Sequence, residues 1–193
     1  MERCPWGDHD ELYRRYHDEE WGVPVHDDRK HFEFLVLEAA QAGLSWITIL
    51  RKREGYRELY AGFDPLLVSQ FDETKVEQLL SDGRIVRNVR KIRASISNAR
   101  KFLEIQEEFG SFDRFLWGFV DNEPVVNGWR TMSEVPPRSE LSDRVSKELI
   151  RRGFSFVGST IIYSHLQAIG VVNDHLVGCF RHSELIQRQT PLT

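Results

Sequence analysis

The sequence lacks the features that identify disulfide-rich, membrane and secreted proteins. Only two cysteines occur among its 193 residues, too few for a disulfide framework. No apolar run reaches the roughly 18 residues that a membrane helix needs, and residues 1–6 lack the apolar core of a signal peptide. Alternating apolar and polar runs, which are typical of half-buried strands, are nearly absent. We therefore expect a soluble, cytoplasmic protein with one domain over residues 1–193, no membrane contact and little β-sheet.

The charge balance is slightly acidic, and the charges are unevenly distributed. The chain has 26 Lys and Arg residues against 30 Asp and Glu residues, a net charge of -4. This balance excludes a protein that coats nucleic acid by bulk charge, so any nucleic-acid binding must use a local basic face. Acidic residues gather in residues 2–28, and basic residues gather in residues 84–101 and at Arg144, Lys147, Arg151 and Arg152.

Apolar residues recur at helical spacing along most of the chain. The pattern i, i+3, i+4 begins after Asp28 and again at Val89, where it continues to Phe109 and should end at Gly110. Asp64-Pro65 is typical of an N-cap followed by Pro at the first helical position. Shorter helices are expected at 45–53, 112–120, 142–152 and 159–169, and residues 121–137 form the longest expected loop. The predicted fold class is all-α.

Residues 73–101 have the layout of a helix–hairpin–helix. A helical pattern over residues 76–80 is followed by Asp82-Gly83 and then by residues 84–101, which hold basic residues and no acidic one. In such an element, backbone N–H groups at a helix start bind one phosphate, and nearby basic side chains add charge. A basic run can also be a solvated helix face. The DNA-binding interpretation assigns Gly83, Arg84 and Arg87 to this contact.

Two cysteines and two histidines near the two ends of the chain form a possible metal site. Twelve residues separate Cys4 from His17, and His175-x-x-x-Cys179 puts both side chains on one face of a helical turn. Two thiolates and two imidazoles are a ligand set of closed, tetrahedral zinc sites. The alternatives are buried free cysteines, surface histidines, or a disulfide, which a reducing cytosol disfavours.

The segment Phe34–Leu50 holds a single charged residue, Glu38. A carboxylate in such apolar surroundings is costly unless it is protonated or paired. Either an Arg elsewhere pairs with Glu38 in a structural salt bridge, or Glu38 recognises a cationic or donor-rich ligand whose charge offsets the desolvation.

Aromatic residues crowd the same part of the sequence. Four of them, Trp6, Tyr13, Tyr16 and Trp21, lie within the first 21 residues. A fifth, Trp46, follows Glu38 by eight positions. Aromatic side chains are more often part of a core, but their faces also attract cations and stack on planar rings. Together with the isolated acid, they indicate a pocket for a flat, positively charged heterocycle.

Taken together, these segments resemble the DNA-3-methyladenine glycosylase I family. The matching pieces are long and span residues 1–179. They are Met1-Glu2-Arg3-Cys4-x-Trp6, Tyr16-His17-Asp18-x-Glu20-Trp21-Gly22-Val23-Pro24, Glu38-x-x-Gln41-Ala42-Gly43-Leu44-Ser45-Trp46, Arg152-Gly153-Phe154-x-Phe156-Val157-Gly158 and Asn173-Asp174-His175-x-Val177-Gly178-Cys179.

The resemblance implies a monofunctional DNA repair enzyme of the helix–hairpin–helix glycosylase superfamily. Such an enzyme hydrolyses the N-glycosidic bond of 3-methyladenine in double-stranded alkylated DNA and releases the free base. The resemblance also implies one structural zinc ion per chain, which joins the chain ends through Cys4, His17, His175 and Cys179.

For the base site, the resemblance favours the ligand role of Glu38 over the salt bridge. Glu38 is then the catalytic residue, through recognition of the base and electrostatic stabilisation. Tyr16 and Trp46 would flank the base, Trp6, Tyr13 and Trp21 would wall the pocket, and Ser164 would add a polar contact. No Lys is expected to act as a Schiff-base nucleophile, so strand cleavage is not expected.

The sequence departs from the family pattern at a few places. The hairpin reads Arg84-Ile85-Val86-Arg87 where the family often has Gly-Ile-Ile-Arg, with Gly83 one place earlier. No Asp aligns with the residue that activates water in related glycosylases. Residues 180–193 match nothing, although His182 among them is a second candidate zinc ligand.

Gly43-Leu44 is the candidate for the element that enters the gap left by an extruded base. It lies between two apolar helices, and Gly allows a close backbone approach; the alternative is that Leu44 belongs to the core. Two rival functions remain for the whole chain. One is a non-catalytic helix–hairpin–helix DNA-binding module, and the other is a zinc hydrolase, which four protein ligands disfavour. We expect a monomer.

Overall fold

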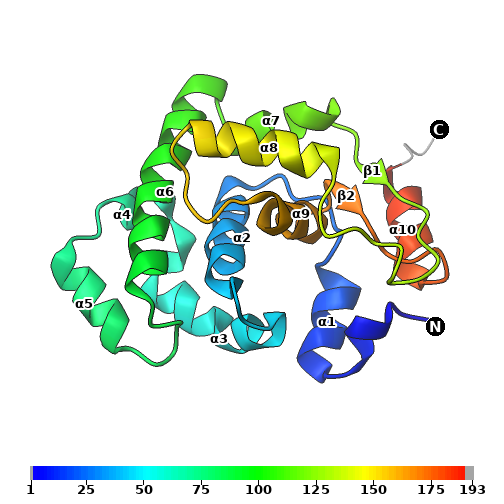
Figure 1. Ribbon diagram of the computed structural model, residues 1–193, viewed down its shortest axis with the longest axis horizontal. Coiled ribbons are helices and arrows are strands. Elements are labelled where there is room, and N and C mark those ends of the chain that lie inside the picture. The colour runs from blue at the N-terminus through cyan, green and yellow to red at the C-terminus, as the bar shows by residue number, and fades with distance from the viewer. Residues whose placement is uncertain (1, 190–193) are drawn as a thin grey trace.

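The computed structural model describes residues 2–189, and helices make up most of them (Figure 1). In chain order the helices are α1 (Glu11–Glu19), α2 (Asp28–Gln41), α3 (Trp46–Leu59), α4 (Pro65–Ser69), α5 (Glu73–Ser81), α6 (Val89–Phe109), α7 (Phe112–Trp117), α8 (Glu140–Arg151), α9 (Ser159–Ala168) and α10 (Phe180–Gln189). Short 3₁₀ turns cover Pro5–Asp8, Ala61–Phe63 and Gly118–Val120. The predicted all-α class is confirmed.

The expected helix ends are formed by the expected residues. The Asp64 side chain accepts from the N–H groups of Leu66 and Leu67 at the start of α4, with Pro65 at the first position. Asn88, which the sequence analysis did not name, caps α6 in the same way, and the expected Gly110 ends this helix in the left-handed conformation. These contacts satisfy backbone groups that a helix end leaves without partners, which is why the sequence fixes the boundaries.

Helix α2 forms the centre of the molecule. Residues 31–40 are all buried, because α2 packs against α3, α6, α7 and α9. A helix covered on all sides needs apolar residues on all sides. This explains why the apolar run of the sequence contains a single charge in its middle.

The first described residues lie beside the start of α10 (Figure 1). The Phe180 N–H donates to the Glu2 carbonyl at 3.1 Å, and α1 lies close to the segment before α10. A parallel pair, β1 (Val125–Val126) with β2 (Val172–Asn173), ties the long loop to the same region. Gly170 allows α9 to end against residues 23–25, because its φ is +73° and a Cβ there would lie 2.4 Å from the backbone nitrogen of Pro24.

Three local expectations are wrong in detail. The helix expected at 45–53 runs on to Leu59. The turn between α5 and α6 is the longer connection 82–88, so Arg84 and Arg87 precede α6 instead of lying on it. His175 and Cys179 lie on the turn before α10 and not on a helix.

No helix among the described residues is long and apolar enough to cross a membrane.

Candidate functional site

A cavity of about 320 Å³ opens between α1, the C-terminal half of α2, the start of α3 and α9. All seven residues assigned to the base site line it, namely Trp6, Tyr13, Tyr16, Trp21, Glu38, Trp46 and Ser164. The fold thus brings together side chains from residues 6–46 and 164, which are separated by more than a hundred positions in the sequence.

Glu38 is the buried acid of this cavity. Its side chain belongs to a residue that is only 4 % exposed, and within residues 2–189 it makes no ion pair and no hydrogen bond. Burial raises the pKa of Glu38 from 4.5 to about 8. The alternative that an Arg pairs with Glu38 is therefore wrong: Arg53 instead pairs with Glu33, one turn earlier on α2, at 2.7 Å.

This burial makes a testable prediction for stability. Between pH 4.5 and about 8 the folded chain keeps a proton on Glu38 that the unfolded chain has released. The free energy of unfolding should therefore fall as pH rises through this window and level off above it. A shift of this size corresponds to at most about 5 kcal/mol.

The measurement is denaturant unfolding of wild type and Glu38→Gln from pH 4 to pH 9. The variant should become more stable relative to wild type as the pH rises. Glu77→Gln, which removes an exposed carboxylate on α5, is the control. A difference between wild type and Glu38→Gln that stays constant with pH would show that Glu38 is solvated or paired in solution.

The aromatic side chains surround Glu38 at stacking distances from one another. The rings of Tyr16 and Trp46 lie 5.6 Å apart, and Trp6 contacts Trp21 edge-on at 4.9 Å. Burial, and then the neighbouring Glu38, hold the pKa of Tyr16 well above its usual range, so its hydroxyl stays protonated. The buried indole N–H of Trp46 interacts with the Tyr16 side chain and partly offsets this rise in pKa. The cavity therefore offers flat faces and an unpaired acid.

The sequence analysis missed the polar wall opposite these rings. Asp174 lines the cavity and is buried, and each of its oxygens accepts two hydrogen bonds. The donors are Asn127 and Trp129 on one oxygen and Tyr163 and Gln167 on the other. Because all four acceptor positions are filled, this carboxylate has no free lone pair for a water molecule.

Asp174 also fixes the long loop at the cavity. The loop supplies Met132, Val135, Pro136 and Pro137 to the lining. The residues of a loop show no periodic pattern, so the sequence does not indicate which of them face a cavity. The only sequence signal for this wall is the segment Asn173-Asp174, which is one of the pieces that carry the resemblance.

Gly43 and Leu44 lie in the turn between α2 and α3, and Gln41 and Trp46 on either side of this turn line the cavity. Leu44 is 41 % exposed, so the alternative that it belongs to the core is wrong. Gly43 adopts φ +81° with no atom near its Cβ position. The Nζ of Lys91, in the first turn of α6, donates to the carbonyls of Ala40 and Ala42 at 2.8 and 2.7 Å. A residue from the basic run thus caps α2, beside the exposed leucine.

The hairpin residues Gly83, Arg84 and Arg87 differ in their contacts with the rest of the protein. Arg84 pairs with Asp82 at 2.7 Å and with Glu58 at 2.5 Å, and a Cβ on Gly55 would meet Arg84 at 2.6 Å, so the hairpin packs tightly on α3. Arg87 is exposed and makes no ion pair within the described residues. Gly83 is exposed with open space around it.

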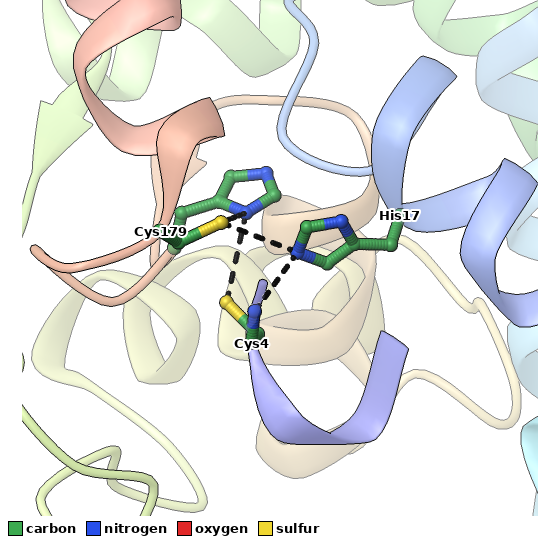
Figure 2. A group of neighbouring side chains, drawn as sticks. Cys4, His17 and Cys179 are labelled. Carbon is green, nitrogen blue, oxygen red and sulfur yellow. Dashed lines mark hydrogen bonds between the residues drawn. The ribbon is translucent and has the colours of Figure 1, made fainter. Parts of the chain in front are cut away.

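The cysteines and histidines at the chain ends form one buried cluster (Figure 2). One ligand atom from each of Cys4, His17, His175 and Cys179 lies within 4.8 Å of all the others. Cys179 Sγ lies 3.4 Å from His17 Nε2 and 3.5 Å from His175 Nδ1. The four side chains converge on one point, as the ligands of a tetrahedral metal do.

The second nitrogen of each imidazole is already held by the protein. His17 Nδ1 contacts Asp18 at 2.8 Å, and His175 Nε2 contacts the Trp21 carbonyl at 2.9 Å. Such partners fix the tautomer of a metal ligand and aim its free nitrogen at the metal. Hydrogen bonds from Cys4 and from the two imidazoles lower the pKa of the Cys179 thiol. The cluster therefore could hold a metal ion.

The structure also bears on the alternatives to a metal site. Both cysteines are buried and free, and both cluster histidines are buried, which excludes surface histidines. His182 lies outside the cluster, because its Nε2 contacts the Asn127 carbonyl at 2.9 Å. The four predicted ligands are thus the ones that the fold brings together.

The cluster of Cys4, His17, His175 and Cys179 lies behind the aromatic wall of the cavity. The Trp21 ring lies 4.6 Å from the His175 ring, and the Trp6 ring lies 5.2 Å from the His17 ring. Any group that holds the two chain ends together also holds these two indoles at the cavity.

Comparison with known proteins places the chain among glycosylases. The family model described as methyladenine glycosylase matches residues 6–182. DNA-3-methyladenine glycosylase 1 of Escherichia coli K12 is 51% identical over 179 residues, which are 93% of this chain and 96% of that protein. The Haemophilus influenzae DNA-3-methyladenine glycosylase is 40% identical over 92% of this chain and 96% of that protein.

A solved structure agrees with these relatives. The 3-methyladenine DNA glycosylase I of Staphylococcus aureus, whose structure addresses its recognition of 3-methyladenine, superimposes with a TM-score of 0.90 at 35% identity. The match covers 93% of this chain and 96% of that one.

Proposed function

The chain belongs to the methyladenine glycosylase family, and from this premise we infer that it removes 3-methyladenine from alkylated DNA. It is a DNA repair enzyme that hydrolyses the N-glycosidic bond of the damaged nucleotide and releases the free base. The observation that supports this activity most directly is the unpaired Glu38 in a cavity walled by aromatic rings.

The chemistry of the substrate explains why such a cavity suffices. Methylation at N3 makes adenine cationic, which weakens its bond to the sugar and turns the base into a good leaving group. The main task of the enzyme is therefore to distinguish the damaged base from normal bases after the base has left the DNA stack. Unstacking also costs less free energy for a damaged base. Tyr16 and Trp46 would flank the extruded ring, where a cation on an aromatic face gains about 1–2 kcal/mol.

Glu38 would complete the recognition of the base. In the empty cavity its charged form is unfavourable, and a cationic or amine-bearing ring supplies the partner that makes ionisation favourable. Glu38 would then accept a hydrogen bond from the exocyclic amine and stabilise the positive charge that develops as the bond breaks. Trp6, Tyr13 and Trp21 would close the pocket, and Ser164 would add a polar contact.

The reaction would stop at base release. Strand cleavage through a Schiff base needs a lysine at the site, and no lysine is among the residues that line the cavity in the described chain.

We further propose that the metal of the Cys4, His17, His175 and Cys179 cluster is one zinc ion. Two thiolates and two imidazoles suit zinc in charge and softness. With four protein ligands no position is open for water, so the ion would act on folding and on the placement of the aromatic wall, and not on the bond that breaks.

Double-stranded DNA would be held outside the cavity. The hairpin region, about residues 73–101, would bind phosphates through Gly83 and the neighbouring arginines. Leu44 would enter the gap left by the extruded base, with Gly43 allowing the close approach. A non-catalytic helix–hairpin–helix module would explain the hairpin but not a buried, unpaired acid in an aromatic cavity.

Incubation with methylated duplex DNA tests this function. The purified chain should release free 3-methyladenine and leave the strand intact, and a Glu38→Ala variant should release far less while binding the duplex normally. Duplex binding without any base release by the wild-type chain would support the non-catalytic module instead.

The hairpin makes a prediction about salt. A plot of the logarithm of the DNA-binding constant against the logarithm of the salt concentration has a negative slope. Each phosphate that a protein cation neutralises steepens this slope by about 0.9. Arg87→Ala should flatten the slope by nearly this amount, whereas Arg84→Ala should change it less, because Asp82 and Glu58 already neutralise Arg84. Titration of a labelled duplex at several salt concentrations measures both slopes, and equal effects of the two variants would show that the ion pairs of Arg84 open when DNA binds.

Lys91 makes a second prediction. Lys91→Met removes both hydrogen bonds to the end of α2 and leaves two carbonyls unpaired, at a cost of about 1–3 kcal/mol. We expect the turn at Leu44 to lose its position, so that excision slows roughly tenfold on duplex DNA and much less on single-stranded DNA.

Arg90→Met is the matched control, because it removes a neighbouring exposed charge without touching α2. Equal losses in Lys91→Met and Arg90→Met would mean that charge alone matters. Equal losses on duplex and single-stranded DNA would contradict the positioning of Leu44.

A further inference from the structure

A second cavity lies far from the base site and has no part in the reaction proposed above. It encloses about 560 Å³ between the C-terminal end of α6, α7 with the turn after it, and α8. We name it the Phe109 groove after the last residue of α6. It contains Arg144, Lys147 and Arg151, three of the four residues in the second basic cluster of the sequence, which the glycosylase function leaves unexplained.

The floor of the Phe109 groove is aromatic. Phe109 is 36 % exposed, and its ring lies 5.1 Å from that of Phe115, which in turn contacts Phe119 at 5.4 Å. The Arg152 guanidinium covers Phe109 and Phe115 at 5.1 and 5.3 Å and so fixes both rings from one side. Phe115 is only 5 % exposed, so Phe109 and the partly exposed Phe119 form the accessible part of this floor. Exposed aromatic rings in a concave site are typical of a surface that receives an apolar anchor.

The rim of the groove carries unpaired positive charge. Arg114, Arg144 and Lys147 line it, and none of them makes an ion pair within residues 2–189. The single acidic residue of the lining, Glu148, is already neutralised by Arg151 and Arg152. A chain with a net charge of -4 therefore presents here a locally positive, partly apolar surface.

The groove lies at the opposite end of α6 from the hairpin (Figure 1). Helix α6 has 21 residues and so spans about 31 Å. A duplex held by the hairpin and Leu44 approaches the other end of the molecule. A duplex backbone also has no apolar group that could fill an aromatic floor, so DNA matches only the rim.

We propose that the Phe109 groove binds a short acidic segment of another protein, with a Phe or a similarly large apolar side chain seated on Phe109, Phe115 and Phe119. The carboxylates of the segment would pair with Arg114, Arg144 and Lys147. Long cationic side chains around an apolar floor match such a segment in both charge and shape. The partner would bring the enzyme to its site of work without covering the base cavity.

Fluorescence polarisation with a labelled peptide, Asp-Glu-Asp-Phe-Asp-Asp-Phe-Glu, tests the proposal. We expect saturable binding in the micromolar range at low salt, at least tenfold tighter than that of two control peptides. One control replaces both Phe residues by Ser, and the other replaces every acidic residue by Lys. Binding within twofold of either control overturns the proposal.

Variants of the protein locate the contact. Lys147→Glu should weaken peptide binding at least fivefold through charge, and Phe109→Ser should do so through the floor, because both residues are exposed and their replacement leaves the core intact. Arg15→Glu makes the same change of charge on α1, outside the groove, and should have little effect. Release of 3-methyladenine should be unchanged in all three variants.

The same variants would reveal whether DNA or a second copy of this chain occupies the groove instead of an acidic peptide. A loss of duplex affinity in Lys147→Glu as large as its loss of peptide affinity would make the groove part of the DNA face. Self-association of the wild type in sedimentation, abolished by Lys147→Glu, would make the occupant a second copy of this chain. Either result overturns the proposal.

Discussion

Glu38→Gln should bind free 3-methyladenine roughly 30- to 150-fold more weakly than the wild type. The substitution keeps the size of the side chain but removes its charge and one of its two acceptor oxygens. A hydrogen bond to a charged group is worth about 2–3 kcal/mol, and each 1.4 kcal/mol corresponds to a factor of ten in affinity. Calorimetry with the free base measures the loss.

Duplex binding separates recognition of the base from general damage to the fold. Affinity for undamaged duplex should barely change in Glu38→Gln, because the proposed phosphate contacts lie on the hairpin. Glu33→Gln is the matched control on the same helix: Glu33 is equally buried but pairs with Arg53 and Arg57. This variant should lose stability and keep its affinity for the base, and base binding by Glu38→Gln at the wild-type level would make Glu38 a structural acid.

Loss of the metal cluster should be the largest change in stability. The purified chain should contain about one zinc ion, and Cys179→Ala should lower both the zinc content and the free energy of unfolding. Because binding energy at such a site is folding energy, we expect a loss of at least about 3 kcal/mol, or roughly 6–12 °C in Tm for a chain of this length. Elemental analysis and thermal unfolding measure the two effects.

Base binding should fall together with the zinc content. The indoles of Trp6 and Trp21 pack against the cluster histidines, so an open cluster leaves this wall of the cavity without support. His182→Ala is the control, since the His182 imidazole contacts the Asn127 carbonyl and is not among the four side chains of the cluster. Full zinc occupancy in a Cys4→Ala, Cys179→Ala double variant would refute the ligand assignment.

The sequence predicted those parts of the molecule that depend on local rules. Helix α6 has both an N-cap and a C-terminal glycine in its own sequence, so both of its ends could be placed. The position of Glu38 could be inferred in the same way, since one acid in an apolar run must be buried wherever that run is buried. The aromatic residues near it in the sequence then pointed to the composition of the cavity.

The remaining features depend on partners that are distant in the sequence. Nothing near Arg84 in the chain indicates that Glu58 neutralises it. The sequence likewise gives no sign that Lys91 caps α2 and does not simply face DNA. The wall around Asp174 uses donors from a loop and from α9, and such a set becomes visible only when the chain is folded.

The junction of the two chain ends also determines when a newly made molecule is complete. Cys4 and His17 are made well before their partners His175 and Cys179, which lie more than 150 residues later in the sequence. At roughly 5–20 residues per second, this delay is about 10–30 s. During that time the first two ligands can form only half a site, and the indoles beside them have no fixed backing. A chain that is truncated before Cys179 would lack one of the four side chains of this cluster, and the indoles of Trp6 and Trp21 beside it would lose part of their support.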